Sequence, residues 1–186
     1  MSASDERHLI HQAKNGSHEA FRSLVERYMK QAYNIAYHIV NDHDDAEDVA
    51  QESFVRSYRA LPSFRGDAEF STWLYRIVTN VSLNRAKQKK TKTMRELPHL
   101  EMYTELAGSH PAYATQADVK MHIEKALHQL PTLQRSVVIL RHIEGLSTKQ
   151  VAGILRCTEG TVKTHLFRAL KKMRTLLQYL QDEHKQ

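Results

Sequence analysis

The chain of 186 residues is 41% hydrophobic and carries 27 Lys and Arg against 21 Asp and Glu, a formal net charge of +6. No run approaches the roughly 18 apolar residues that span a membrane, and the polar start lacks the pattern of a secretory signal, so we expect a cytoplasmic protein. The single cysteine, Cys157, excludes an intramolecular disulfide, and six glycines and four prolines leave little material for hairpins, which favours an all-α fold.

Two amphipathic helices are predicted in the first third of the chain. Ser17 can cap a helix whose apolar residues recur every three or four positions until about Asn41. The tetrapeptide Asp44-Asp45-Ala46-Glu47 has the spacing of a capping box, and the helix that follows it is expected to stop at Pro62.

The second of these helices turns an acidic face outward. Six acids cluster between residues 42 and 52 without an intervening Lys or Arg. Asp48 and Glu52 lie four residues apart, as metal ligands or paired acids can, but no matching His pair or second carboxylate pair completes such a site. We interpret the face as a docking surface for a protein, with a plain solvated acidic face as the alternative.

The loop from Pro62 to Phe70 and a third helix, capped by Ser71, combine aromatic and basic side chains and lead into a basic stretch near Lys90. Trp73 lies on the apolar stripe of this helix and is expected in the core. Aromatic rings beside cations suit single-stranded nucleic acid, because bases stack on the rings and cations hold the backbone. The candidates for such contacts are Phe64, Arg65 and Asn80.

Periodicity fades over residues 93–117, which we predict to be a flexible linker between domains at 1–92 and 118–186. The second domain is expected to begin with a helix that ends at Pro131. A further helix follows, closed by Gly145 in the place of a left-handed cap.

The last segment has the form of a helix-turn-helix. Ser147 to Gln150 has the spacing of a capping box, and Thr158 can cap a longer helix after a short turn. Such a second helix enters the major groove of DNA, and the net charge of +7 over residues 120–186 favours DNA over a hairpin in an ordinary bundle. A helical wheel places Val162, Leu166, Ala169, Leu170 and Met173 toward the core and Thr164, Phe167, Arg168 and Lys171 outward.

Motifs in both halves resemble the extracytoplasmic-function (ECF) group of the bacterial sigma-70 family. Residues 45–54, DAEDVAQESF, resemble its region 2, and residues 70–77, FSTWLYRI, together with Asn80 resemble its minus-10 reading segment. Residues 144–147, EGLS, and 160–163, GTVK, are similar to region 4, the helix-turn-helix that reads the minus-35 element.

The resemblance implies a factor that binds core RNA polymerase, directs it to specific promoters and assists promoter melting and initiation. It implies contacts of region 2 with the beta-prime clamp and of region 4 with the beta flap, an anti-sigma partner, and neither enzymatic activity nor a cofactor. The residues implied to bind the core polymerase are Asp45, Asp48, Gln51 and Glu52. Those implied at the minus-10 element are Phe64, Arg65, Arg76, Asn80 and Arg85. Those implied at the minus-35 element are Arg156, Lys163, Thr164, His165, Phe167, Arg168 and Lys171.

The recognition turn departs from the family pattern. Arg156-Cys157-Thr158 stands where the family commonly has Gly-x-Pro, and Thr164-His165 stands in place of Ser-Arg, so the minus-35 preference of the family does not carry over. Arg156 is a candidate for a new phosphate contact, and His165 for pH-dependent binding.

Two other functions remain open from the residues alone. One is a homodimeric helix-turn-helix regulator of duplex operators, and the other is a helical adaptor without a DNA role. The acidic helix and the aromatic loop argue against both, since a simple repressor needs neither. A metal site is not expected, because among twelve histidines only His8 and His11 have useful helical spacing.

Overall fold

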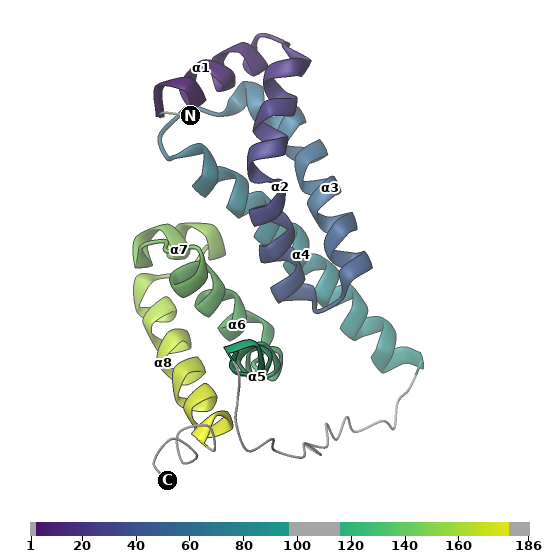
Figure 1. Cartoon of the computed structure of the whole chain (residues 1–186), viewed down its shortest axis with the longest axis vertical. Helices are drawn as coiled ribbons and strands as arrows, with labels where there is room; N and C mark the ends of the chain where they lie inside the picture. The colour runs from purple at the N-terminus through teal and green to yellow at the C-terminus, as the bar shows by residue number, and fades with distance from the viewer. Residues whose placement is uncertain (1–2, 97–115, 179–186) are drawn as a thin grey trace.

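The computed structural model describes residues 3–96 and 116–178, and within these ranges it contains helices and turns but no strand (Figure 1). This confirms the all-α prediction. The N-terminal lobe comprises α1 (Ala3–Lys14), α2 (His18–Val40), α3 (His43–Ala60), the short 3-10 helix η1 (Leu61–Ser63) and α4 (Phe70–Glu96). The C-terminal lobe comprises α5 (Gln116–His128), α6 (Thr132–Val138), the π-helical turn η2 (Ile139–Ile143), α7 (Thr148–Leu155) and α8 (Glu159–Leu176).

The predicted start and end of α2 are confirmed. Ser17 is the N-cap, and Asn41 is a left-handed C-cap with φ of 56°. The capping box expected at residues 44–47 is wrong, because Asp42 is the N-cap of α3 and its carboxylate accepts the backbone N–H of Asp45 at 3.1 Å. The helix therefore begins at His43.

The boundaries of α4 also differ from the prediction. The backbone N–H of Trp73 donates to the carbonyl of Glu69, so the helix begins at Phe70 and Ser71 lies inside its first turn rather than capping it. At its other end α4 continues to Glu96, beyond the predicted start of the linker. Residues 97–115 of that linker lie outside the described residues.

Helix α1, which the periodicity did not predict, packs against α2. The hydroxyl of Tyr28 donates to the Glu6 carboxylate at 2.6 Å, and Arg27 forms an ion pair with the same carboxylate at 3.1 Å. Lys14, at the end of α1, donates to the carbonyl of Phe64 at 2.8 Å. These contacts hold the N-terminal helix against both α2 and the loop that follows η1.

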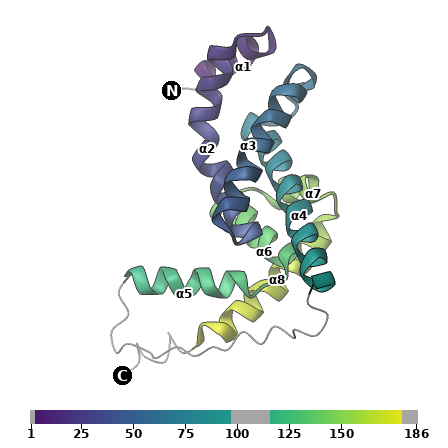
Figure 2. The same cartoon turned by 90° about the vertical axis from the view of Figure 1, so that its right-hand side faces the viewer.

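The two lobes, predicted as two helical domains joined by a flexible linker, also share one apolar core. Val151 and Ile154 of α7 belong to the same buried cluster as Leu74 and Val78 of α4. Figures 1 and 2 both place α7 beside α4, while α5 projects sideways in Figure 2. The described structure is therefore a single packed body.

Polar contacts cross the boundary between the lobes as well. Arg135 is buried and donates to the carbonyl of Ile39 at 2.7 Å and to that of His128 at 3.1 Å. Tyr75 of α4 is hydrogen-bonded to Glu144, and burial, followed by the charge of Glu144, raises the pKa of Tyr75. Buried polar groups need such partners, because an unpaired one loses its hydrogen bonds to water.

Among the described residues, no helix combines the length and the apolar character needed to cross a bilayer.

Candidate functional site

Helix α3 presents one face to the core and the other, as predicted the acidic one, to solvent. Its buried residues are Ala46, Val49, Ala50, Ser53, Phe54 and Ser57. On the opposite face Asp48 and Gln51 are exposed, and Val55 retains 51% of its surface. Glu52 is half-buried and accepts a hydrogen bond from Nε of Arg56 at 3.0 Å. This face therefore combines acidic and amide groups with one exposed apolar side chain.

The acids at the start of α3 pair with two cations of α4. Nη1 of Arg85 lies 3.0 Å from Asp45 and 3.6 Å from Asp48. Nζ of Lys89 lies 2.8 Å from Asp42 and 3.0 Å from Asp45. We call these five residues the α3–α4 ion-pair network.

The hydrogen bond from Lys89 holds the pKa of the Asp42 carboxyl below its usual value, and the same bond raises the pKa of Lys89. Sequence reasoning treated the acidic and basic surfaces as separate and counted Lys89 in the basic run without placing it among the site residues. The four-residue spacing of Arg85 and Lys89, which puts both on one face of α4, is the signal that could have found it.

The loop after η1 forms a shallow hollow with the start of α4. Phe64 is 9% exposed, and its ring lies 5.1 Å from Trp73 and 5.8 Å from Phe70 between centroids. Phe64 therefore packs in the core, whereas Trp73, which was expected there, is half-buried. Phe64, expected to be available to bases, is thus buried because the loop folds it inward, while Trp73 is partly buried and packs against the same core.

Polar side chains surround this hollow, whose volume is about 310 Å³. Arg65 and Arg76 line it and are exposed, so their guanidinium groups are available to an anion. Asn80 is half-buried and lies one helical turn beyond Arg76, on the same side of α4 as Trp73. Trp73, Arg76 and Asn80 thus lie along one side of α4, with Arg65 on the preceding loop, and Asn80 lies outside the lining of the hollow.

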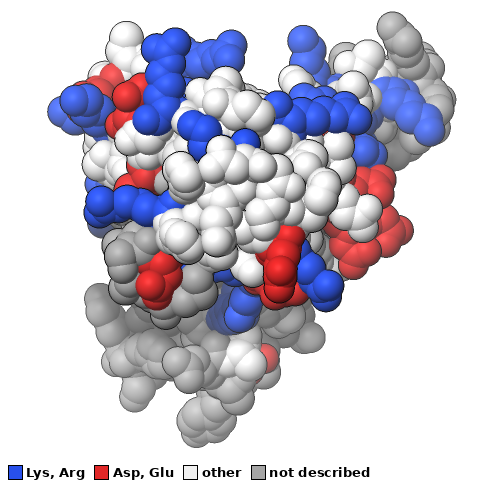
Figure 3. Space-filling model, turned by 90° about the horizontal axis from the view of Figure 1, so that it is seen from above, with Lys and Arg blue, Asp and Glu red and all other residues white. Residues whose placement is uncertain are grey.

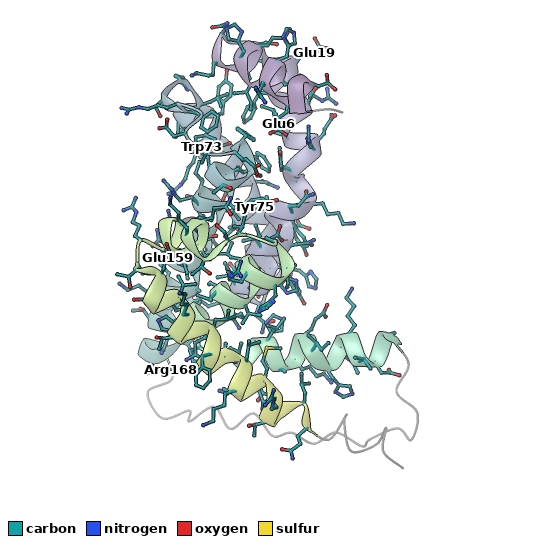
Figure 4. The ribbon with its side chains drawn as sticks, turned by 90° about the vertical axis from the view of Figure 1, so that its left-hand side faces the viewer. Glu6, Glu19, Trp73, Tyr75, Glu159 and Arg168 are labelled. Atoms are coloured by element: carbon teal, nitrogen blue, oxygen red, sulfur yellow. The ribbon has the colours of Figure 1, made fainter. Side chains whose placement is uncertain are left out.

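The C-terminal lobe lies next to this surface. Helix α7 approaches α4 closely at Gly153, where even a Cβ atom would lie 3.5 Å from Nη2 of Arg76. The Gln150 side chain of α7 also donates a hydrogen bond to Oγ1 of Thr72 at 3.1 Å. In Figure 4, Trp73 and Tyr75 lie on α4, while Glu159 and Arg168 lie along α8. The two candidate nucleic-acid surfaces are therefore on different helices of one packed body.

The predicted helix-turn-helix is present, with both of its caps. Ser147 accepts the N–H of Gln150 at 3.2 Å, and the Gln150 side chain accepts the N–H of Ser147 at 2.8 Å, which completes the capping box. Thr158 caps α8 as expected. Arg156 closes α7 in the left-handed region with φ of 53°, a conformation that favours glycine and here holds an exposed arginine.

The outer face of α8 carries most of the predicted minus-35 residues in exposed positions: Lys163, Thr164, Phe167, Arg168 and Lys171. Phe167 retains 70% of its surface. His165 is half-buried, and its Nδ1 is buried without a hydrogen-bond partner. Leu170, expected in the core, is 44% exposed, whereas Val162 and Ala169 are buried. The helical wheel was wrong for Leu170, because the rest of the protein covers a narrower face of α8 than the wheel predicted.

Charge is divided among patches instead of covering one face. Figure 3 shows Lys and Arg side chains in separate groups, with Asp and Glu gathered between and beside them around a broad uncharged area. Within the described ranges, no three His, Cys, Asp or Glu side chains gather in a way that could hold a metal ion.

Comparisons with known proteins match both halves of the chain. Residues 24–92 match the family model for sigma-70 region 2, and residues 120–173 match that for sigma-70 region 4. The RNA polymerase sigma-H factor of Pseudomonas aeruginosa is 33% identical, with 98% of this chain and 99% of that protein aligned. The ECF RNA polymerase sigma factor SigW of Bacillus subtilis is 34% identical over 92% and 96% of the two chains.

A solved structure is also similar. The sigma factor RpoE of Bartonella quintana, in complex with the anti-sigma factor NepR, is 25% identical, with a TM-score of 0.68. The similarity covers 85% of this chain and 96% of that one.

Proposed function

This chain belongs to the ECF group of the sigma-70 family of RNA polymerase sigma factors, and we propose how its surfaces recruit core RNA polymerase, recognise specific promoters and assist melting and initiation. The observation that carries the proposal is that the exposed face of α3 lies in the region 2 match and the exposed face of α8 in the region 4 match. We assign the N-terminal lobe, which extends to Glu96, to core polymerase and minus-10 binding, and the C-terminal lobe, which begins at Gln116, to minus-35 binding.

The region 2 match separates this function from the two alternatives. A helix-turn-helix repressor or a helical adaptor needs no surface for polymerase or for an opened promoter strand. The chain is expected to act without chemistry of its own, in the cytoplasm where bacterial RNA polymerase works. A similar sigma factor forms a complex with an anti-sigma factor, which supports a partner of that kind here.

The docking surface on the clamp of the polymerase is assigned to α3. Asp48 and Gln51 project into solvent, and Glu52 lies one turn further along the same face. Asp45 retains 19% of its side-chain surface and is already paired with two cations, so it lies at the edge of this surface. The test is gel filtration of the chain with purified core polymerase: co-elution supports the assignment, and separate elution contradicts it.

The minus-10 element is assigned to the hollow beside α4. Extruding a base from the duplex costs a few kcal/mol, so a surface that assists melting must recover that energy through stacking and hydrogen bonds to the base. Arg65 and Arg76 supply the charge for the backbone, and Asn80 supplies an amide for a base edge.

Asn80→Ala should reduce opening of duplex promoters by roughly 2- to 10-fold, since one hydrogen bond contributes about 0.5–1.5 kcal/mol. Permanganate reactivity of unpaired thymines measures opening, and the defect should shrink on a template whose minus-10 segment is already mismatched. Asn84→Ala is the matched control, because Asn84 is exposed one turn further along α4. Equal opening by wild type and Asn80→Ala would remove Asn80 from the site.

The minus-35 element is assigned to the outer face of α8. The DNA for this test is a duplex with a minus-35 element, chosen because polymerase carrying this chain binds it. We expect Arg168→Ala to weaken binding of that duplex by roughly 10- to 100-fold if Arg168 reads a guanine, since such a bidentate contact discriminates by about 1–3 kcal/mol. If Arg168 contacts a phosphate, the slope of log K against log salt should fall by about 0.9. Fluorescence anisotropy at several salt concentrations measures both. Arg174→Ala, an exposed arginine near the end of α8, is the control, and equal losses in the two variants would contradict the assignment.

A further inference from the structure

The α3–α4 ion-pair network joins residues with different assigned partners. Asp45 and Asp48 belong to the surface assigned to polymerase, and Arg85 to the surface assigned to DNA, yet they pair with each other at 3.0 and 3.6 Å. Lys89 completes the network through Asp42 and Asp45. While these pairs are formed, two cations of α4 are neutralised by acids of α3.

The ion pairs of this network are partly exposed, so they contribute little to the stability of the fold and other charges can replace them. The side chains of Asp48 and Lys89 are 63% and 48% exposed, and that of Arg85 is 32% exposed. Ion pairs at such positions are screened by water and contribute little to folding. The pair between Arg85 and Asp48 combines the longest distance with the most exposed acid, so it is the first that an incoming charge can replace.

The acids remain stable when their cations leave. Asp42 is the N-cap of α3, and Asp45 lies in its first turn, where the positive end of the helix dipole favours negative charge. The cations are accessible to a new anion, because Arg85 also lines a groove of about 850 Å³ between α3 and α4, beside Arg56 and Lys87, and the Lys89 side chain is 48% exposed. Both halves of the network can therefore accept new partners.

We propose that binding of polymerase opens this network: basic side chains of the polymerase take over the acids of α3, and the released Arg85 and Lys89 bind phosphates of promoter DNA. This inference rests on the proposed function and adds its regulation, because the free chain then has fewer charges available to DNA than the polymerase-bound chain. It also assigns a DNA-binding role to Lys89, which sequence reasoning did not single out.

The double variant Asp42→Asn/Asp45→Asn tests the exchange without polymerase. Asparagine is as good an N-cap as aspartate, so the fold should survive, which circular dichroism checks. The free full-length variant should bind a fluorescein-labelled duplex of mixed sequence severalfold more tightly than wild type. Because each neutralised phosphate contributes about 0.9 to the salt slope, release of both cations should steepen it by up to about 1.8.

Two controls separate the exchange from a general change of charge. Asp44→Asn removes an exposed carboxylate of the same turn that takes no part in the network, and it should leave the salt slope unchanged. Adding Lys89→Ala to the double variant should remove about half of the gain in slope. The proposal would be overturned if the double variant bound DNA with wild-type affinity and salt slope. It would also be overturned if the gain in DNA affinity remained after Arg85→Ala and Lys89→Ala were both added to the double variant.

The readout also distinguishes this inference from the proposed function. The duplex assay contains no polymerase, so a gain in DNA affinity would stand even if the chain failed to bind core polymerase. Conversely, normal binding to polymerase without any gain in DNA affinity would overturn the exchange alone.

Discussion

Asp48→Arg should lower the affinity of the chain for core polymerase by about 100-fold, equivalent to about 2.7 kcal/mol. Asp48 projects from the exposed face of α3, and a like charge placed against a basic partner surface costs up to several kcal/mol. The change should leave the fold intact, because the Asp48 side chain is 63% exposed and its ion pair with Arg85 is long, at 3.6 Å. Titration of labelled chain with core polymerase, followed by anisotropy, measures the affinity.

Glu19→Arg is the matched charge reversal for that experiment. Glu19 is exposed at the start of α2, on the part of the molecule near α1 (Figure 4), and is not one of the residues assigned to polymerase. It should bind polymerase as wild type does. If Asp48→Arg also binds with wild-type affinity while its circular dichroism is unchanged, the docking surface is not on this face of α3.

Arg135→Ala should lower the free energy of unfolding by about 2–4 kcal/mol, the largest stability effect expected from a polar residue of this chain. Its guanidinium joins α6 to the last turn of α2 through the carbonyl of Ile39 and to the end of α5 through that of His128. Removing it leaves the Ile39 carbonyl without this charged donor at a buried position. Urea unfolding followed by circular dichroism measures the loss.

The control for Arg135 is Arg22→Ala, because Arg22 is 81% exposed beside Glu26 and its ion pair should contribute at most about 0.5 kcal/mol. Burial and the charge of Arg135 together lower the pKa of His128 to about 4, so His128 is neutral at neutral pH and adds no charge beside the guanidinium. Equal losses in the two variants would show that the buried contacts between the lobes contribute nothing beyond a surface arginine.

Local patterns predicted the helices well because capping and periodicity act over a few residues. The caps Ser17, Ser147 and Thr158, the end of α2 near Asn41 and the left-handed position of Gly145 all follow from neighbouring residues, and the structure confirms them. The cap of α3 was misplaced because several adjacent aspartates can each cap a helix, and the spacing of one short motif does not decide among them.

Capping and periodicity could not predict contacts between residues that are far apart in the chain. The inward turn of Phe64 depends on Phe70 and Trp73, and the donor to its carbonyl is Lys14, fifty positions away in the chain. The α3–α4 ion-pair network likewise joins residues about forty positions apart. The packing of α7 on α4 depends on apolar surfaces that each lobe could equally have buried within itself.

In the candidate site too, local patterns predicted which side chains are exposed but not which of them pair. Helical spacing predicted which residues of α3 and α8 are exposed, with Leu170 as the exception. It did not predict that Arg85 and the acids of α3 would be partners, because charge runs were assigned to surfaces without knowing which helices pack together. The residue roles in polymerase and promoter binding stay predictions until the variants are measured.

The most direct test of the central claim is transcription by core polymerase supplied with this chain. Sheared genomic DNA from the source organism serves as template, and the 5′ ends of the transcripts are mapped with and without the chain. We predict start sites that appear only with the chain, share upstream minus-10 and minus-35 elements, and are depleted when Asp48→Arg replaces wild type. Transcripts whose start sites are the same with and without the chain would contradict the account.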